Sequence, residues 1–244
     1  MNNAVFITVR LKSTRLSKKV LLNVNGQPIL KYLTDRIHEN FSGKIVLCTS
    51  INSEDDPIVN FAINEELLFY RGSENDVLDR YYKTCVKFSI DKFYIIYGDE
   101  PFTDIDTMNE NFEMLDENLP MWIKNDSLPE GTYGYGMTFK GIEYLNTNKM
   151  AVDLEVWQLM ASKMSLKKIE NKAELKDSYE NIRLTIDYED DLKVFEIIIN
   201  KIGKLYKTIS LGELVKIYKE EGLYKINGFR IEEYKARIIQ QGTI

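Results

Sequence analysis

Residues 5–22, VFITVRLKSTRLSKKVLL, join a short apolar run to a basic loop. The run at residues 5–9 predicts a buried strand. The first carboxylate of the chain is Asp35. Charge alone would favour a solvated basic surface, but cations concentrated directly after a first strand indicate a pocket for a polyanion such as a triphosphate. The cations of the loop are Arg10, Lys12, Arg15, Lys18 and Lys19.

Outward from this stretch, the first half of the chain alternates strand-like and helix-like segments. Short apolar runs bounded by turns predict strands at residues 4–9, 44–49, 67–71 and 92–97. Helical spacing of apolar residues predicts helices at residues 28–41, 55–64 and 74–88. This alternation is typical of an α/β fold with a mainly parallel sheet and helices on both faces.

The second half of the chain is less regular. Its apolar runs predict strands at residues 121–124, 133–139 and 181–186, and helices at residues 104–115, 151–165, 190–202, 210–221 and 231–240. Because no linker rich in Pro, Gly or Ser interrupts the 244 residues, we expect one domain spanning residues 1–244. Residues 120–180 suggest an excursion from the main sheet, where oligomer contacts could lie.

Composition excludes several classes of protein. The net charge of −6 argues against nucleic-acid binding, and no apolar run is long enough to cross a membrane. Two cysteines, Cys48 and Cys85, make no disulfide framework and indicate a reduced, cytoplasmic setting. The one histidine, His38, lies in a helical pattern, which argues against a His-dependent hydrolase or a His-ligated zinc site.

Polar clusters follow the predicted strands, at the sheet edge where open parallel sheets bind ligands. The basic loop lacks glycine, so it is neither a G-x-G-x-x-G turn nor a P-loop. Asp99 ends the run at residues 93–97, and Asp187 ends the run at residues 183–186. Together they are candidate Mg²⁺ ligands, since this hard ion takes carboxylates and substrate phosphates. A turn aspartate at Asp99 and a helix start at residues 189–191 are the structural alternatives.

A fourth cluster, RGSEND at residues 71–76, lies between a predicted strand and its helix. Ser73 or Asn75 could cap that helix. The same residues, at the same edge of the sheet, could instead contact a base or a ribose.

Together these motifs resemble one family. The loop RLKSTRLSKKVL is similar to the R-x-x-S-x-R-L-x-x-K signature of the cytidylyltransferases that make CMP-activated acidic sugars. That group includes the CMP-sialate and CMP-3-deoxy-manno-octulosonate synthetases and a spore-coat polysaccharide branch, which the chain resembles most. INSEDDPIVNFA, YRGSENDVLDRYYKT, YGDEPFTD and IRLTIDYEDDLKVFEII resemble recurring segments of that branch, in the same order. The resemblance spans most of residues 4–199 and implies a Rossmann-like nucleotide-diphospho-sugar transferase fold.

The resemblance implies a role for each matching position. It implies that Arg10, Ser13, Arg15 and Lys19 bind the triphosphate of CTP. It places Arg71, Ser73 and Arg80 near cytosine and ribose, and it makes Asp99 and Asp187 the ligands of Mg²⁺. Three positions depart from the pattern: Lys12 and Lys18 stand where small residues are common, and Ser17 replaces the usual proline. Lys12 and Lys18 add charge to the nucleotide-binding loop, and the three departures leave nucleotide preference and loop shape open.

The implied reaction is attack of an acceptor oxygen on the α-phosphorus of CTP, with pyrophosphate leaving. Arg15, Lys19, Asp99 and Asp187 are then the catalytic residues. The acceptor implied is an acidic sugar, or another acceptor of a surface polysaccharide pathway, bound around residues 121–135, and the resemblance also implies a homodimer. A glycosyltransferase is a lesser alternative, because such enzymes usually carry an Asp-x-Asp motif where this chain has Gly98-Asp99-Glu100-Pro101. A non-catalytic nucleotide-binding protein is the other.

Overall fold

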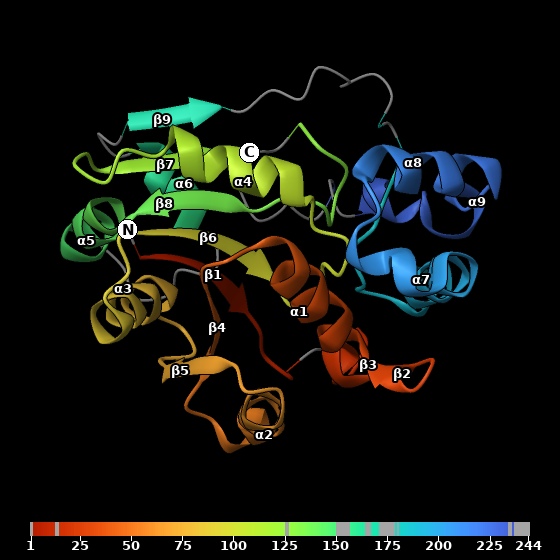
Figure 1. Cartoon of the computed structure of the whole chain (residues 1–244), viewed down its shortest axis with the longest axis horizontal. Helices are drawn as coiled ribbons and strands as arrows, with labels where there is room; N and C mark the ends of the chain where they lie inside the picture. Colours follow the sequence, from red (N-terminus) through yellow and green to blue (C-terminus); the bar gives the residue numbers. More distant parts are fainter. Residues whose placement is uncertain are drawn as a thin grey trace.

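The computed structural model describes residues 2–12, 15–124, 127–149, 157–163, 167–170, 179, 181–233 and 236. Within these residues the main sheet has seven strands in the order β5-β4-β1-β6-β8-β7-β9 (Figure 1). Four of its six strand pairs are parallel, and β8 is antiparallel to both of its neighbours. The bounds are β5 Leu68–Gly72, β4 Lys44–Ser50, β1 Asn3–Thr8, β6 Lys92–Tyr97, β8 Tyr135–Thr138, β7 Met121–Lys124 and β9 Lys167–Glu170.

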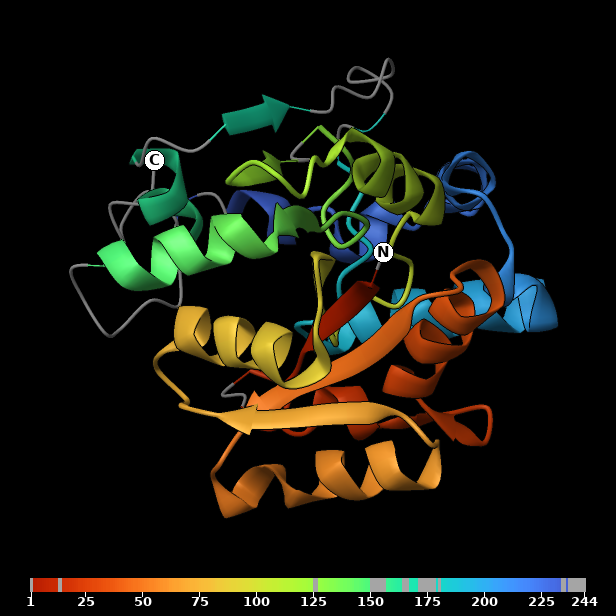
Figure 2. The same ribbon diagram turned by 60° about the vertical axis from the view of Figure 1, so that its left-hand side comes forward.

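Helices cover both faces of this sheet, as predicted. One face packs against α1 Ile29–Asn40, α2 Asp56–Asn64 and α4 Ile105–Met114. The other packs against α3 Val77–Phe88, α5 Phe139–Asn148 and α6 Trp157–Lys163. Figure 2 shows α2 and α3 on opposite sides of β4 and β5, with α5 lying beside α3.

Strand β1 shows why the two faces form. Successive side chains of a strand point to opposite faces. Val5 and Ile7 therefore join the core under α1 and α4, whereas Ala4 and Phe6 join the core under α3. All four side chains are fully buried. A strand that is apolar on both faces is what a parallel sheet covered by helices requires.

A third apolar cluster joins the C-terminal helices to the start of α1. It brings Ile29 and Tyr32 together with α7 Glu189–Ile202, the 3₁₀ helix η4 Gly203–Lys207 and α8 Leu211–Glu220. A short helix, α9 Tyr224–Asn227, follows. Figure 1 shows α7, α8 and α9 grouped beyond the arrowhead of β6, at the edge where the parallel strands end.

Most predicted elements are present with ends shifted by one to three residues. One prediction is wrong: residues 181–186 form no strand, and the segment has a single bridge, between Arg183 and Glu130. Its backbone N–H groups bond instead to separate loops, Leu184 to the carbonyl of Glu130 and Ile186 to that of Asp99. The apolar run is therefore buried without joining a ladder.

Several elements differ from or extend the sequence expectation. The hairpin β2 Asn23–Val24 with β3 Gln27–Pro28, the 3₁₀ helices, α5, β9 and α9 were not predicted. The predicted helix at residues 151–165 is described only as α6, and of residues 231–240 only 231–233 and 236 are described, all helical. In the region 120–180, strands β7, β8 and β9 extend the main sheet. No helix in the described ranges is long and apolar enough to span a membrane.

Candidate active site

The predicted site lies where the strand order reverses. The chain runs from β1 outward to β4 and β5, then returns to the other side of β1 as β6. The carboxyl ends of β1 and β6 lie at a topological switch point, the usual position of ligands in open α/β sheets. The basic loop follows β1 and Asp99 follows β6, so the topology brings both to this edge of the sheet.

Backbone hydrogen bonds bring the third segment to the same place. The N–H of Gly98 donates to the carbonyl of Thr8 at 2.9 Å, which continues the β1–β6 pairing by one residue. The N–H of Ile186 donates to the carbonyl of Asp99, also at 2.9 Å. Asp187 therefore lies next to Asp99, although the two residues are far apart in the sequence.

Lys19 occupies the space between the two carboxylates. It begins the 3₁₀ helix η1 Lys19–Leu21, and its side chain is mostly buried. Its ammonium donates to an oxygen of Asp99 and, at 2.7 Å, to Oδ1 of Asp187. Arg15 Nη2 donates to the same Oδ1, also at 2.7 Å. All four residues predicted as catalytic thus form one cluster.

The charges of this cluster stabilise one another. Burial alone would lower the pKa of the Lys19 ammonium, but the charges of Asp99 and Asp187 outweigh it and raise that pKa. Burial alone would likewise raise the pKa of Asp187, and the cations beside it, Lys19 first, lower that pKa instead. Lys19 is therefore charged and Asp187 ionised at neutral pH.

The two carboxylates form a donor set that suits a divalent metal ion. Both bind the same ammonium, so their oxygens converge on one cationic position. The described residues contain no cluster of three or more acidic, His or Cys side chains that would hold a metal by themselves. Mg²⁺ fits such a pair, because it usually takes one or two carboxylates and completes its shell with water and substrate phosphates.

Two further cations of the basic loop contact Glu74. Glu74 forms ion pairs with Arg10 at 3.5 Å and Lys12 at 3.2 Å, and it accepts a hydrogen bond from Asn52 at 2.6 Å. These contacts tie the loop after β1 to the loop after β5. Ser13, the remaining predicted phosphate ligand, lies outside the described residues.

The residues predicted near the base lie around the loop after β5. Arg71 donates to the carbonyls of Ser50 and Asn52 and pairs with Asp56 at 2.7 Å. Ser73 Oγ accepts a hydrogen bond from the N–H of Asp76. The carboxylate of Asp76 accepts from the N–H of Asp79, so Asp76 caps α3 in place of Ser73 or Asn75.

Arg80 lies beneath this loop. It is fully buried, and its Nη1 donates to the carbonyl of Ser73 at 3.2 Å. A Cβ at Gly72 would come within 3.0 Å of the Arg80 side chain, so glycine allows this close packing. Arg80 thus supports the loop from below.

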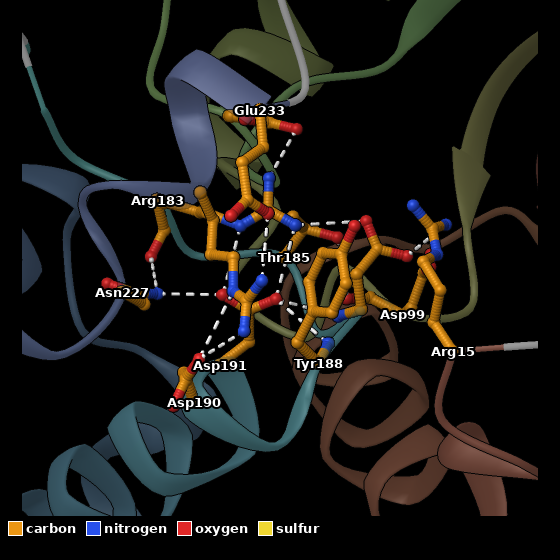
Figure 3. A network of polar contacts seen from close by, with 12 residues as sticks. Arg15, Asp99, Arg183, Thr185, Tyr188, Asp190, Asp191, Asn227 and Glu233 are labelled. Atoms are coloured by element: carbon orange, nitrogen blue, oxygen red, sulfur yellow. Dashed lines mark hydrogen bonds and ion pairs between the residues drawn. The ribbon is translucent and has the colours of Figure 1, made fainter. Parts of the chain in front are cut away.

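The residues that hold Asp187 are not among the predicted site residues. Arg183 is fully buried, and its Nη2 donates to Asp187 Oδ2 at 3.0 Å. Asp191 accepts from Arg183 and from the backbone of residues 187 and 188 (Figure 3). The available signal was an arginine inside the apolar run IRLTI, since an arginine is almost never fully buried without a partner.

An aromatic ring adjoins the cluster. The guanidinium carbon of Arg15 lies 5.3 Å from the centroid of the Tyr188 ring, and that of Arg230 lies 4.2 Å from it. Arg230 is also paired with Asp190 at 2.7 Å. The residue that follows Asp187 thus contacts cations from both ends of the chain.

Comparison with known proteins identifies relatives of this chain. A family model described as cytidylyltransferase matches residues 4–219. An uncharacterized protein of Methanocaldococcus jannaschii is 31% identical over 195 residues, covering 78% of this chain and 79% of that protein. The spore coat polysaccharide biosynthesis protein SpsF of Bacillus subtilis is 34% identical over 110 residues, covering 43% of this chain and 46% of SpsF.

Two further matches concern a named enzyme and a solved structure. The 3-deoxy-manno-octulosonate cytidylyltransferase of Brucella canis is 32% identical over 112 residues, 44% of each chain. The chain thus matches less than half the length of SpsF and of this enzyme. The structure of a cytidylyltransferase from Leptospira borgpetersenii superposes with a TM-score of 0.84 at 22% identity, covering 93% of this chain and 98% of that one, and shows that the fold is shared.

Proposed function

Because this chain belongs to the cytidylyltransferase family, we propose that it transfers CMP from CTP to an acidic sugar or a related acceptor of a surface polysaccharide pathway, releasing pyrophosphate. The observation that carries the proposal is the cluster at the switch point. Two carboxylates from distant segments share the ammonium of Lys19, and Arg15 binds one of them. A charge-matched site of this kind suits a triphosphate and its metal ion.

In the proposed reaction an acceptor oxygen attacks the α-phosphorus of CTP. A new P–O bond forms, and the bond to the β-phosphate oxygen breaks as pyrophosphate leaves with its electron pair. Arg15 and Lys19 stabilise the negative charge that builds on the leaving group. Little covalent chemistry is required of the protein, because positioning and charge neutralisation account for most of such catalysis.

Asp99 and Asp187 are the proposed ligands of Mg²⁺. The bound ion would neutralise phosphate charge and lower the pKa of an acceptor hydroxyl. The Lys19 ammonium lies at the cationic position between these carboxylates.

The remaining predicted contacts complete the proposed substrate site. We place the triphosphate along Arg10, Lys12 and Ser13, and the cytosine and ribose at the loop of Arg71, Ser73 and Arg80. The acceptor is proposed to bind around residues 121–135. An acidic sugar is the first candidate, since a relative is named as a 3-deoxy-manno-octulosonate cytidylyltransferase. By resemblance, the enzyme is proposed to be a homodimer, which light scattering would test.

Pyrophosphate release tests this function. The purified chain is incubated with each of the four NTPs, with and without Mg²⁺, and with candidate acceptors such as 3-deoxy-manno-octulosonate and sialic acid. We expect release with CTP, Mg²⁺ and an acceptor together. CTP binding without release for any acceptor would favour a non-catalytic nucleotide-binding protein. Turnover of a nucleotide sugar in place of CTP would favour a glycosyltransferase.

The variant Asp99→Asn tests the role of the carboxylate pair. It keeps the shape of the side chain but removes a charge from the proposed metal site, so the rate of pyrophosphate release should fall by about 10³-fold or more. Glu113→Gln, which removes a charge from an exposed position on α4, is the matched control and should retain the wild-type rate. A near-normal rate in Asp99→Asn would rule out this site.

A further inference from the structure

A buried polar network connects Asp187 to the C-terminal helices. Its central residues are Arg183, Asp191 and Asn227, all of which are at most 2% exposed. Figure 3 shows Arg15 at one end of this network and Asn227 near the other. None of the three lies in the basic loop or is proposed to contact CTP, so the proposed substrate contacts do not account for this network.

Both ends of Asp187 are held by this network. Its carboxylate oxygen Oδ2 accepts from Arg183 Nη2 at 3.0 Å, while Oδ1 faces Lys19 and Arg15. Its backbone N–H donates to Asp191 Oδ2 at 2.9 Å. The main chain and the side chain of the proposed metal ligand are therefore both fixed, which limits the positions that its oxygens can occupy.

Asp191 is the residue on which these contacts converge. Oδ2 accepts from the N–H groups of Asp187 and Tyr188 and from Arg183 Nη2, and Oδ1 accepts from Arg183 Nε at 2.9 Å. A helix cap alone explains the bond to Tyr188, the residue that precedes α7. It does not explain the bond to Asp187 or the pairing with an arginine that itself binds Asp187.

Asn227 extends the network to α8 and α9. Its amide nitrogen donates to Asp191 Oδ1 at 2.9 Å and to the carbonyl of Arg183 at 3.1 Å. Its amide oxygen accepts from the hydroxyl of Tyr218, in α8, at 2.5 Å. The carboxylate of Asp191 is thus oriented by a residue that does not itself contact Asp187.

We propose that Asp191 is a positioning residue for the metal ligand Asp187, and that Asn227 orients Asp191, so that α8 and α9 help to set the geometry of the metal site. This inference rests on the proposed function, because it takes Asp187 as a metal ligand. Hydrogen-bond partners of metal ligands fix the orientation and basicity of the ligand, and their loss typically weakens metal binding by about 10- to 100-fold.

Metal affinity in Asp191→Asn tests the proposal. The readout is the Mn²⁺ concentration that gives half of the maximal increase in Tm, at one fixed CTP concentration and without acceptor. Asparagine has one acceptor oxygen where Asp191 has two, so an amide N–H of the variant must face either the N–H of Asp187 or the donors of Arg183 and Asn227. Either arrangement breaks the network around Asp187, so the half-maximal concentration should rise by about tenfold or more. The Mg²⁺ concentration for half-maximal pyrophosphate release should rise in parallel.

The matched control is Glu189→Gln. Glu189 is exposed in the same first turn of α7, and its substitution removes the same charge from the same helix end. Its half-maximal Mn²⁺ concentration should equal that of the wild type. A merely structural role of Asp191 would lower the Tm of the metal-free protein and leave the half-maximal concentration unchanged, which would overturn the proposal.

Asn227→Ala provides the second variant, and it decides the matter if Asp191→Asn does not fold. It leaves every contact of Asp187 in place, so a rise in the half-maximal Mn²⁺ concentration, smaller than that of Asp191→Asn, is expected. An unchanged value in folded Asn227→Ala would also overturn the proposal. A wild-type protein whose Tm does not respond to Mn²⁺ with CTP would instead count against the proposed function.

Discussion

Lys19 is a buried lysine whose ammonium is shared by two carboxylates from distant parts of the chain. Such a residue is unusual, because a buried charge is tolerated only when it is paired. Here Asp99 and Asp187 supply the pairing, and Lys19 in turn keeps the two carboxylates from facing each other unneutralised. One side chain thus serves the proposed chemistry and the stability of the fold.

Substituting Lys19 should therefore reduce stability as well as activity. In Lys19→Met the two carboxylates lose their shared cation, although Asp187 keeps its two arginines. The free energy of unfolding of the metal-free protein should fall on the order of 2 to 3 kcal/mol, as measured by urea denaturation. Lys18→Met, at the exposed neighbouring position, is the control. Equal losses in both variants would show that the pairing of Lys19 does not matter.

Among the elements, the segment at residues 181–187 has the most unusual role. It is buried like a strand but bonds to two different loops, and this arrangement carries Asp187 to Asp99. Gly131 allows the approach, since its φ is +88° and a Cβ there would lie 2.1 Å from the backbone nitrogen of Thr185. No L side chain fits in that space without moving the segment.

Gly131→Ala should be strongly destabilising. Strain from the positive φ and the clash with the backbone of residues 184–185 together should lower the free energy of unfolding by about 3 kcal/mol or more. Gly212→Ala is the contrasting variant, because Gly212 lies in the helix α8 with nothing within 4 Å of its Cβ position, and it should be neutral or stabilising by about 0.5 to 1 kcal/mol. Thermal unfolding of both measures the difference, and a mild effect of Gly131→Ala would contradict the close approach.

Across the whole molecule, Arg36 ties the first half of the chain to the C-terminal part. This buried arginine of α1 donates to the carbonyls of Thr103, Tyr206 and Ile209 at 2.8 to 3.0 Å. The same region holds the apolar cluster of α1, α7, η4 and α8. Polar and apolar contacts therefore join the C-terminal helices to α1. One of these helices, α7, also holds the backbone of Asp187 through Asp191.

Removing this tie should weaken the whole fold. Arg36→Met leaves three buried carbonyls without their donor, so the free energy of unfolding should fall on the order of 3 kcal/mol. The exposed Glu39→Gln on the same helix should change it by less than about 0.5 kcal/mol. Urea denaturation followed by circular dichroism distinguishes them. A wild-type midpoint for Arg36→Met would mean that these three hydrogen bonds contribute nothing measurable.

Local pattern was enough to predict the alternating elements of the first half and the α/β class. A buried parallel strand and an amphipathic helix each leave a periodic signal within a few residues, as at β1 and α3. The basic loop and Asp99 could be assigned to one edge for the same reason, because each directly follows a predicted strand. Asp187 was assigned to the same edge because it directly follows an apolar run, although that run forms no strand, and the family resemblance implied the same role as a metal ligand.

The local signal for the support of Asp187 was the arginine inside the apolar run IRLTI, and it did not identify the partners of that arginine. Residues 181–186 have the apolar pattern of a strand, but their backbone partners are the separate loops at Glu130 and Asp99. Arg183, Asp191 and Asn227 form a site only because α7 and α9 pack beside that segment. The periodicity of a sequence reports which face of a segment is buried, whereas partners distant along the chain are chosen by the packing of the folded molecule.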